Sequence, residues 1–503
     1  MGENNLRQKP DSEIKEQLSK AGFPARHELA GWKARPTNKQ GEKKMAIYDL
    51  TPVKVKKVET KYRSIKTMIP VPESLPIFEE LGKSEPRSMA GQPPIVWHKA
   101  KGFTVSDKWG NRWIDWSSGV LITNAGHGRK EICDRLKELI DQGLLATYVF
   151  VHEGRMELTR ELRMLSPDPD KYQVFLLSTG SEATENCIKL AKTYALEKHG
   201  PSKKYIVSFE NAFHGRTMGS QLAGGMPRLK KWIGDLDPSF VQVPFPDGYK
   251  NENTSFDLFL KTLKDKGVSP KNIAGVISES YQGVGPDFLP VDYAKKLEAF
   301  CRENDIILIM DEVQAGFGRS GKMFTYQHYG IKPDLIACGK GISSSLPISA
   351  VIGRTDVMSI YPPGSMTSTH SASPLAVASA LENLKIIKNE KLVENSAKMG
   401  EIMNPALEAI QKKHSSFLGC FHGKGLVAGI QVVKPGTKTP DPEMAQKINV
   451  ACLQKGLLMF APVGIAGECV KIAPPLCITE DALRESIEVF REAVEEVAKA
   501  SSK

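Results

Sequence analysis

Lys340 stands between two glycines in the stretch DLIACGKGISSS, residues 334–345. The apolar run Leu335–Cys338 ends just before it, which is typical of a buried strand followed by a turn. Many lysines beside glycines are simply solvated turn residues. A poorly solvated lysine instead loses basicity and becomes a usable nucleophile, and small neighbours let the backbone approach a ligand. Lys340 is therefore a candidate catalytic amine.

Two carboxylates end other apolar runs. Glu279 ends AGVISE, residues 274–279, and Asp311 follows the aliphatic residues of DIILIMDE, residues 305–312. An acidic residue after four or five buried aliphatic positions is costly unless it is paired. We therefore expect Asp311 to have a cationic partner at the end of its strand.

A third group of residues could hold an anion and a planar ring. Gly180 and Ser181 follow the run VFLLS and open a helical stretch, so their free N–H groups and the helix dipole suit a phosphate. Phe213 and His214 follow YIVSF, where a planar ring could stack on Phe213 and Arg216 could hold a carboxylate through a two-point fork. The alternatives are an ordinary capped helix, a core aromatic residue and a surface arginine.

The elements that carry these residues indicate an α/β protein. Short unbroken apolar runs alternate with helical stretches, and they occupy residues 174–178, 205–209, 274–279, 305–312, 334–338 and 348–353. Such runs predict a mostly parallel sheet covered on both faces, with ligands at the carboxyl ends of its strands. Candidate residues follow the ends of five of the runs, so we expect them to meet at one edge of the sheet.

The rest of the chain predicts a smaller α+β domain and an extension. Residues 103–119 read as a hairpin, and strands near residues 425–433 and 469–474 precede a closing amphipathic helix at 479–500. A short helix is predicted near Ser12–Ala21. We predict an N-terminal extension and arm (1–92), the N-terminal part of the small domain (93–154), a large cofactor-binding domain (155–375) and the C-terminal small domain (376–503).

Composition limits the class of protein and indicates its cellular compartment. Residues 1–70 carry 16 of the 68 basic residues but 8 of the 58 acidic ones, so most of the net charge of +10 belongs to an N-terminal arm. No nucleic-acid motif accompanies this arm, and no apolar run is long enough to span a membrane. The N-terminus lacks the features of a secretory signal or a transit peptide. Eight scattered cysteines without metal-ligand spacing indicate reduced thiols in a cytoplasmic protein with no metal site.

A phosphate site, a stacking aromatic residue, a buried acid and a desolvated lysine at one edge suit pyridoxal 5′-phosphate (PLP). In a PLP site a lysine forms a Schiff base, an acid keeps the pyridine nitrogen protonated, and a helix N-terminus holds the phosphate.

Four segments resemble the class III aminotransferases, the ornithine and 4-aminobutyrate aminotransferase group of fold-type I PLP enzymes. They are STGSEATEN, FHGRT, DEVQAGFGRSG and PDLIACGKGIS, which occur in the family's order. The similarity runs from about Pro93 to Ala500 and implies a large domain with a mostly parallel sheet plus a smaller α+β domain. It also implies a PLP-dependent transaminase.

The resemblance assigns roles to individual residues. It makes Lys340 the Schiff-base lysine and Asp311 the partner of the pyridine nitrogen. It places Val313 and Phe213 on the two faces of the ring, and Gln314 near the ring hydroxyl.

Further roles concern the phosphate and the substrate. Gly180 and Ser181 match the phosphate-binding turn, and Thr369 matches a threonine that binds the phosphate from the neighbouring subunit. This implies a homodimer with shared sites, and a dimer of dimers stays open. Val120 matches an apolar residue that faces the substrate, and Arg216 matches a residue that holds a distal carboxylate. His214 and Glu279 complete the cofactor-binding set.

The chain departs from the family pattern at two positions. The stretch ESYQGVG carries Val284 where the family usually has a glutamate that pairs with an arginine of the C-terminal domain. The matching arginine position is Lys471, in CVKIAPP. Lys471 could bind a carboxylate as a point charge but not through a fork. A solvated strand lysine is the alternative.

The sequence thus predicts a PLP-dependent transaminase that moves an amino group from an amino acid or ω-amino donor to a keto acid, 2-oxoglutarate or pyruvate. The nearest alternative is a racemase or epimerase of the same family, which uses the same cofactor. A dinucleotide-dependent oxidoreductase would need a glycine-rich turn that opens a helix, which GFGRSG at residues 316–321 matches only in part. The last alternative is a non-catalytic scaffold that uses the basic arm.

Overall fold

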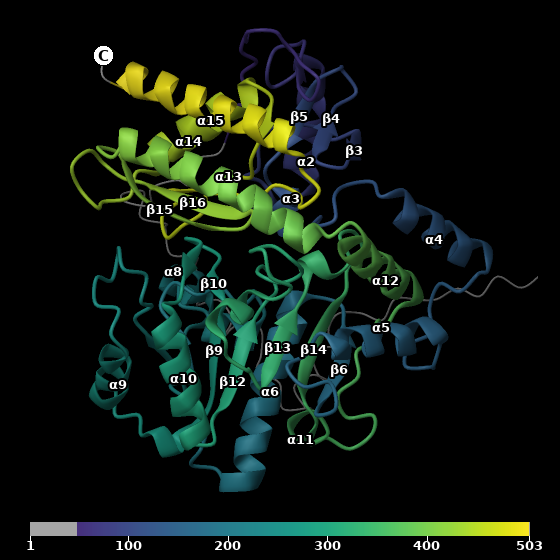
Figure 1. Ribbon diagram of the computed structural model, residues 1–503, viewed down its shortest axis with the longest axis vertical. Helices are drawn as coiled ribbons and strands as arrows, with labels where there is room; N and C mark the ends of the chain where they lie inside the picture. Colours follow the sequence, from purple (N-terminus) through teal and green to yellow (C-terminus); the bar gives the residue numbers. More distant parts are fainter. Residues whose placement is uncertain (1–47, 502–503) are drawn as a thin grey trace, which may run out of the picture. The chain divides into compact units, whose positions relative to one another are not determined.

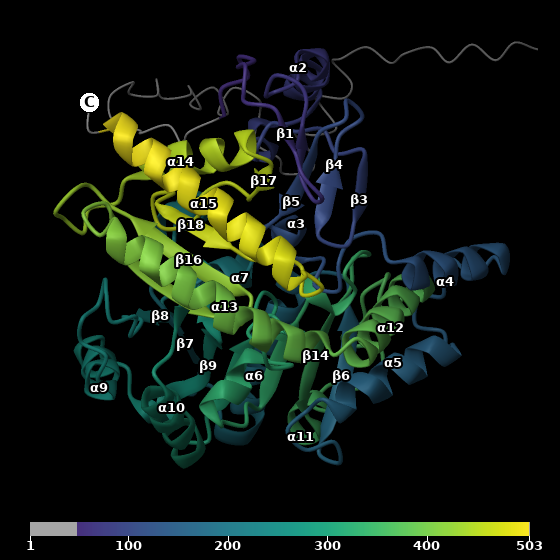
Figure 2. The same ribbon diagram turned by 45° about the horizontal axis from the view of Figure 1, so that its top comes forward.

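The largest sheet in the described part of the chain has seven strands, in the order β6-β14-β13-β12-β9-β7-β8 (Figures 1 and 2). The computed structural model describes residues 48–501. The strands are β6 (Tyr172–Leu177), β7 (Tyr205–Phe209), β8 (Phe240–Val243), β9 (Ile273–Glu279), β12 (Ile307–Asp311), β13 (Leu335–Cys338) and β14 (Ser349–Arg354). Only β14 runs antiparallel to its neighbours, so the predicted mostly parallel sheet is confirmed.

Helices bury both faces of this sheet. Helix α6 (Gly180–His199) packs on one face, where Ile307 and Ile309 of β12 join its core. Leu308 and Met310 of the same strand point to the other core, which includes α5 (Glu153–Met164), α9 (Phe256–Asp265) and α10 (Val291–Glu303). Successive side chains of a strand point to opposite faces, so an unbroken aliphatic run is what a sheet covered on both sides requires.

Two local predictions are also confirmed. Helix α6 ends at Gly200, whose φ of 81° is in the region that glycine tolerates best. The predicted hairpin is formed by β4 (Thr104–Ser106) and β5 (Arg112–Asp115), which pair antiparallel.

A second sheet lies with a group of C-terminal helices. Strands β15 (Leu418–Lys424), β16 (Val427–Val432) and β18 (Cys469–Ile472) pair antiparallel in that order. Figures 1 and 2 show α13 (Leu392–Lys413), α14 (Pro442–Gln454) and α15 (Glu480–Ser501) beside this sheet. The predicted strands near residues 425–433 and 469–474 and the closing helix are therefore present.

A third sheet joins residues from distant parts of the chain. It contains β1 (Val58–Glu59), β2 (Ser64–Ile65), β3 (Lys99–Lys101), β4 and β5, and β17 (Leu457–Leu458) pairs parallel with β5. The described residues, 48–501, belong to one compact unit, and the division at residues 92, 154 and 375 stays a prediction. The helix predicted near residues 12–21 lies outside the described residues.

The remaining elements connect these layers. They are α2 (Leu75–Ser84), α3 (Ser118–Leu121), α4 (Lys130–Asp141), α7 (Met218–Ala223), α8 (Pro227–Lys230), α11 (Thr355–Met358), α12 (Pro374–Asn389), β10 (Tyr281–Gln282) and β11 (Asp287–Phe288). Within residues 48–501, no helix is long and apolar enough to cross a membrane.

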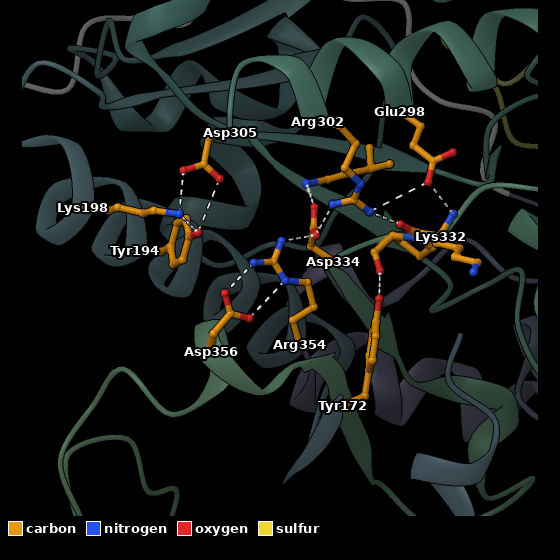
Figure 3. Close-up of polar contacts among 12 residues, drawn as sticks. Tyr172, Tyr194, Lys198, Glu298, Arg302, Asp305, Lys332, Asp334, Arg354 and Asp356 are labelled. Carbon is orange, nitrogen blue, oxygen red and sulfur yellow. Dashed lines mark hydrogen bonds and ion pairs between the residues drawn. The ribbon is translucent and has the colours of Figure 1, made fainter. Parts of the chain in front are cut away.

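A cluster of charged residues lies at the edge of the large sheet where β12 and β13 begin and β14 ends (Figure 3). Asp334 is fully buried there and accepts a hydrogen bond of 2.8 Å from the backbone N–H of Leu308. Its carboxylate also pairs with Arg302 and lies 2.7 Å from the guanidinium of Arg354. Arg354 in turn pairs with Asp356. The charges at this edge therefore neutralise one another.

Candidate active site

Lys340 begins a short turn at the opposite edge of the sheet, two residues after β13 ends. Its φ of 42° lies in the left-handed region, which costs free energy for a residue with a side chain and is often kept at functional sites. A Cβ on Gly339 would lie 3.2 Å from Val313 Cγ1, and one on Gly341 would lie 2.4 Å from Asn124 Nδ2. The backbone is thus closely approached on both sides of the lysine, which explains the two glycines.

Asp311, at the end of β12, is 4% exposed. The imidazole Nδ1 of His214 lies 2.8 Å from its Oδ2, and the backbone N–H of Val313 donates to its Oδ1 over 3.0 Å. The sequence predicted a cationic partner for Asp311; the structure instead places the imidazole of His214, from the loop after β7, against its carboxylate.

Glu279, at the end of β9, is also buried. It accepts hydrogen bonds of 2.9 Å from the backbone N–H groups of Phe213 and Gly283. Burial, together with the nearby charge of Asp311, raises the pKa of Glu279 to about 7. Through its two hydrogen bonds, the carboxyl group of Glu279 joins the loop that carries Phe213 to the loop after β9.

Burial acts on Lys340 in the other direction. It lowers the pKa of the Lys340 amine, and the charges of Asp311 and Glu279 only partly oppose this shift. A larger share of the amine is then neutral near pH 7 than for a solvated lysine, as the sequence predicted. A neutral amine can act as a nucleophile or accept a proton.

The N-terminus of α6 faces the same place. The side chain of Thr179 accepts from the N–H of Glu182, whose carboxylate accepts in return from the N–H of Thr179. This capping box leaves the first-turn amides of Gly180 and Ser181 for another acceptor. Backbone donors and the helix dipole make the turn suitable for a phosphate.

These groups line one pocket of about 150 Å³. Its predicted members are Gly180, Ser181, Phe213, His214, Glu279, Asp311, Val313, Gln314 and Lys340. Thr179 and Gly215 also line it and were not among the predicted residues. The position of Thr179 directly before the phosphate turn is the sequence signal that would have found it.

Lys471 lies beside this pocket on β18 and is 2% exposed, so the alternative of a solvated lysine is wrong. Its amine donates to the carbonyl of Gly283 over 2.9 Å and to Oε1 of Gln314 over 2.8 Å. Burial lowers the pKa of Lys471 to about 7. Val284, at the position of the missing glutamate, is buried as well.

Besides Lys471, three other predicted residues do not line the pocket. Arg216 is exposed, with its guanidinium 5.7 Å from the centre of the Phe213 ring. Val120 is 41% exposed and has a φ of 64°, within a run of left-handed residues from Ser118 to Leu121. Thr369 is exposed in the loop before α12.

The segment GFGRSG does not open a helix. Residues 316–321 form turns after β12, which excludes a dinucleotide fingerprint at this place. Arg319 within it is fully buried and bonds the carbonyl oxygens of Leu426 and Pro474 and the side chains of Ser118 and Asn124. Sequence reasoning missed this contact, which joins the turn after β12 to the loops around the other two sheets. Among residues 48–501, no cluster of three or more metal-ligating side chains occurs.

Comparisons with known proteins agree on one family. Residues 87–494 match the family model described as "Aminotransferase class-III". The 4-aminobutyrate aminotransferase of Mycobacterium leprae is 30% identical over 441 residues, which cover 85% of this chain and 97% of that protein.

Two solved structures are similar as well. The (S)-enantioselective omega-transaminase of Thermomicrobium roseum has a TM-score of 0.74 and 29% identity, covering 80% of this chain and 93% of that one. An ornithine aminotransferase of Toxoplasma gondii, described with partial occupancy of PLP at its active site, has a TM-score of 0.76 and 25% identity. This match covers 86% of this chain and 97% of that one.

Proposed function

The chain belongs to the class III aminotransferases and is a PLP-dependent transaminase, and we propose that it moves an amino group from an amino acid or ω-amino donor to a keto acid, 2-oxoglutarate or pyruvate. The observation that supports this proposal most is the pocket that Lys340 and Asp311 share with the N-terminus of α6. The named relatives are aminotransferases, which favours transfer over racemisation.

The residues of the pocket suit PLP. Bound PLP supplies an electron-withdrawing ring that carries the amino group between the two substrates. In this proposal the amides of Gly180 and Ser181 hold the phosphate. Val313 and Phe213 would pack on the two faces of the ring. Gly180 also allows Val313 to lie against the phosphate turn, since a Cβ on Gly180 would come within 2.6 Å of Val313 Cγ1.

Asp311 and Lys340 carry the proton chemistry. The Asp311 carboxylate holds a proton on the ring nitrogen, and His214 and the Val313 N–H keep the carboxylate in place. Lys340 Nζ removes a proton from the substrate carbon that bears the amino group, because burial leaves more of this amine neutral. Gln314 would lie near the ring hydroxyl, and Lys471 donates a hydrogen bond to its Oε1.

An ω-amino donor is the substrate class that the surroundings favour. The names of two relatives refer to 4-aminobutyrate and to an omega-transaminase. Arg216 would hold a distal carboxylate of such a donor, and Val120 would contact its apolar chain. Val284 adds another apolar surface, which tolerates an uncharged middle of the donor better than a glutamate would.

Lys471 would receive the carboxylate of the keto acid. Its partners, Gly283 and Gln314, are neutral acceptors, so its amine has no carboxylate partner among the described residues. An arriving carboxylate would raise the pKa of Lys471 from about 7 and favour the charged amine. Because Val284 cannot pair with it, nothing acidic at that position competes with the substrate.

We further propose a homodimer with shared sites in the cytoplasm. Residues 140–156 expose the large apolar side chains Ile140, Leu145, Phe150, Val151 and Met156. Tyr148 in this segment bonds Thr367, beside Thr369. An exposed apolar patch of this kind supports an interface, which would bring Thr369 to the phosphate of the neighbouring subunit. All eight cysteines are free, which supports a reducing compartment.

Mixed dimers test the shared site. A Lys340→Ala subunit paired with a Thr369→Ala subunit gives one site with both lesions and one with neither. Activity should then exceed that of either parent. No recovery, with subunit exchange verified, would contradict the role of Thr369 across the interface.

The half-reactions test the proposed function. The holoenzyme is mixed with 4-aminobutyrate, or with an α-amino acid, and no keto acid. A transaminase should release one equivalent of carbonyl product per site with a matching change in the cofactor spectrum, and 2-oxoglutarate or pyruvate should restore the spectrum. Loss of optical rotation of the α-amino acid without carbonyl product would instead establish the racemase.

A further inference from the structure

The imidazole of His214 uses only one of its two nitrogens within the described part of the chain. Nδ1 lies 2.8 Å from Asp311, and the side chain is fully buried. Nε2 is buried too, and no group among residues 48–501 forms a hydrogen bond with it. A buried ring nitrogen without a partner is costly, so a partner for Nε2 is expected.

A small pocket lies against this histidine. It is lined by Ala212, Phe213, His214, Gly215, Gln221, Gly224, Met226 and Leu229. About 10 Å³ of it is open to the centre of a water molecule, which is roughly the space that one water needs. Only His214 and Gln221 among these residues have polar side chains.

Gln221 has one amide group available on that side. It lies on α7 and is 6% exposed. Its Oε1 accepts a hydrogen bond of 2.9 Å from the indole N–H of Trp232. The amide Nε2 is then the group of Gln221 left to face the pocket as a donor.

We propose that this pocket binds one water molecule, which links Gln221 Nε2 to His214 Nε2 and makes Gln221 a positioning residue for Asp311. The water accepts a hydrogen bond from the glutamine amide and donates one to the imidazole. Nε2 then carries no proton, so the single proton of the neutral ring lies on Nδ1 and is donated to Asp311. The chain of bonds runs from Trp232 through Gln221, the water and His214 to the carboxylate.

This arrangement keeps the Asp311 carboxylate aimed into the PLP pocket. If the proton moved to Nε2, Nδ1 would face the carboxylate with a lone pair and repel it. The effect on turnover rests on the proposed role of Asp311. The water and the tautomer do not rest on it, and both can be measured in the cofactor-free protein.

A crystal structure of the cofactor-free protein is the first test. It should contain one water within hydrogen-bond distance of His214 Nε2 and Gln221 Nε2. A pocket closed by side chains, or a water that contacts only one of the two groups, would overturn the proposal.

Nitrogen NMR of the cofactor-free protein, labelled in its histidine rings, tests the tautomer. The protein has ten histidines, and a His214→Gln variant identifies the signals of this residue. Nε2 should give the signal of an unprotonated nitrogen that accepts a hydrogen bond. Gln221→Leu should move it downfield, towards a nitrogen that accepts none. Gln242→Leu, which removes another part-buried glutamine that bonds the carbonyl of Leu222 on α7, should leave it unchanged.

Gln221→Glu keeps the size of the side chain and reverses the bonding. A carboxylate can only accept, so the water should turn round and His214 Nε2 should become a protonated donor. Unaltered His214 signals in both Gln221 variants would refute the link even if one variant folds poorly.

Kinetics of the holoenzyme separate positioning from binding. Gln221→Leu should lower kcat about threefold to tenfold, as expected for the loss of one hydrogen bond, with the KM of both substrates nearly unchanged. A change confined to KM would contradict a role through Asp311. If the tautomer shift appears while kcat stays normal, the water link stands and the proposed role of Asp311 fails.

Discussion

The two edges of the seven-stranded sheet treat their charges in opposite ways. At the edge drawn in Figure 3, the buried Asp334 is opposed by two arginines and a backbone N–H. At the other edge, burial raises the pKa of Glu279 to about 7 and lowers that of Lys340. At the first edge, opposite charges of the protein pair with one another. At the second edge, charged groups remain that a bound cofactor and substrates can pair with.

This difference separates stability from chemistry. Charges that are fully paired hold strands and helices together but have ordinary reactivity. Charges that are buried with incomplete pairing cost stability and gain unusual proton affinities, which is what an active site needs. Substitutions at the two edges should therefore affect different measurements.

Lys340→Ala should have the largest effect on activity. Loss of the group that moves the proton should lower kcat by about 10²–10⁴-fold or more. The melting temperature of the cofactor-free protein should stay the same or rise, because a poorly solvated amine is removed. Stopped assays and calorimetry measure the two quantities. A Lys340→Ala variant with a lower melting temperature but normal kcat would show that Lys340 serves stability and not the reaction.

Asp311→Asn should come next. The amide cannot hold a proton on the ring nitrogen, so kcat should fall about 10²-fold, close to 3 kcal/mol, while much of the PLP stays bound. Cofactor content per subunit and kcat are measured on the same sample. Near-normal kcat with full cofactor would remove Asp311 from the mechanism.

Asp334→Asn should act on stability instead. Removing the carboxylate leaves Arg302 and Arg354 facing each other without their buried partner, which should cost about 2–4 kcal/mol of unfolding free energy. Asp356→Asn is the matched control, since Asp356 also pairs with Arg354 but is exposed, and it should cost under about 1 kcal/mol. In both variants kcat per folded subunit should match wild type. Equal losses from the two substitutions would show that burial of the ion pair does not matter.

Lys471→Met should have the smallest effect on turnover. We expect the KM for the keto acid to rise by a factor that corresponds to about 1–2 kcal/mol of lost binding free energy. The KM for a donor without an α-carboxylate should change less. An unchanged KM for the keto acid would argue against the carboxylate site.

The same variant tests how the free energy of unfolding depends on pH. The folded-state pKa of Lys471 is about 7 and its ordinary value is 10.5. Between these values the unfolded chain binds a proton that the folded chain has lost, so stability should rise with pH across this window. Lys471→Met should flatten that rise in urea titrations of the cofactor-free protein. A slope identical to wild type would place the amine in solvent.

The sequence predicted which residues meet at this edge of the sheet because the signals are local. Glu279 and Asp311 end their strands, and Gly180, Phe213 and Lys340 follow theirs within four residues; a mostly parallel sheet brings such ends together. Strand β8 was missed because Phe240–Val243 is short and alternates apolar with polar or partly buried positions. A continuous run was the signal used for the other strands.

Other features depend on long-range packing that no local pattern contains. Lys471 is a single lysine in a short strand, and its burial follows from how β18 lies against Gly283 and Gln314. The opposing arginines of Asp334 come from the end of α10 and the end of β14, far apart in the chain. The pocket beside His214 is lined only by residues 212–229, but no residue pattern in this segment indicates a pocket.

The identity of the amine that holds the cofactor tests the central claim most directly, because two lysines whose pKa values are lowered, Lys340 and Lys471, lie in or beside the pocket. The holoenzyme is reduced with borohydride, which fixes PLP to the amine that holds it, and is then digested and mapped by mass spectrometry. We predict one PLP per chain, on the peptide that contains Lys340, and none on the peptide that contains Lys471. PLP fixed to Lys471, or to neither lysine, would contradict the account.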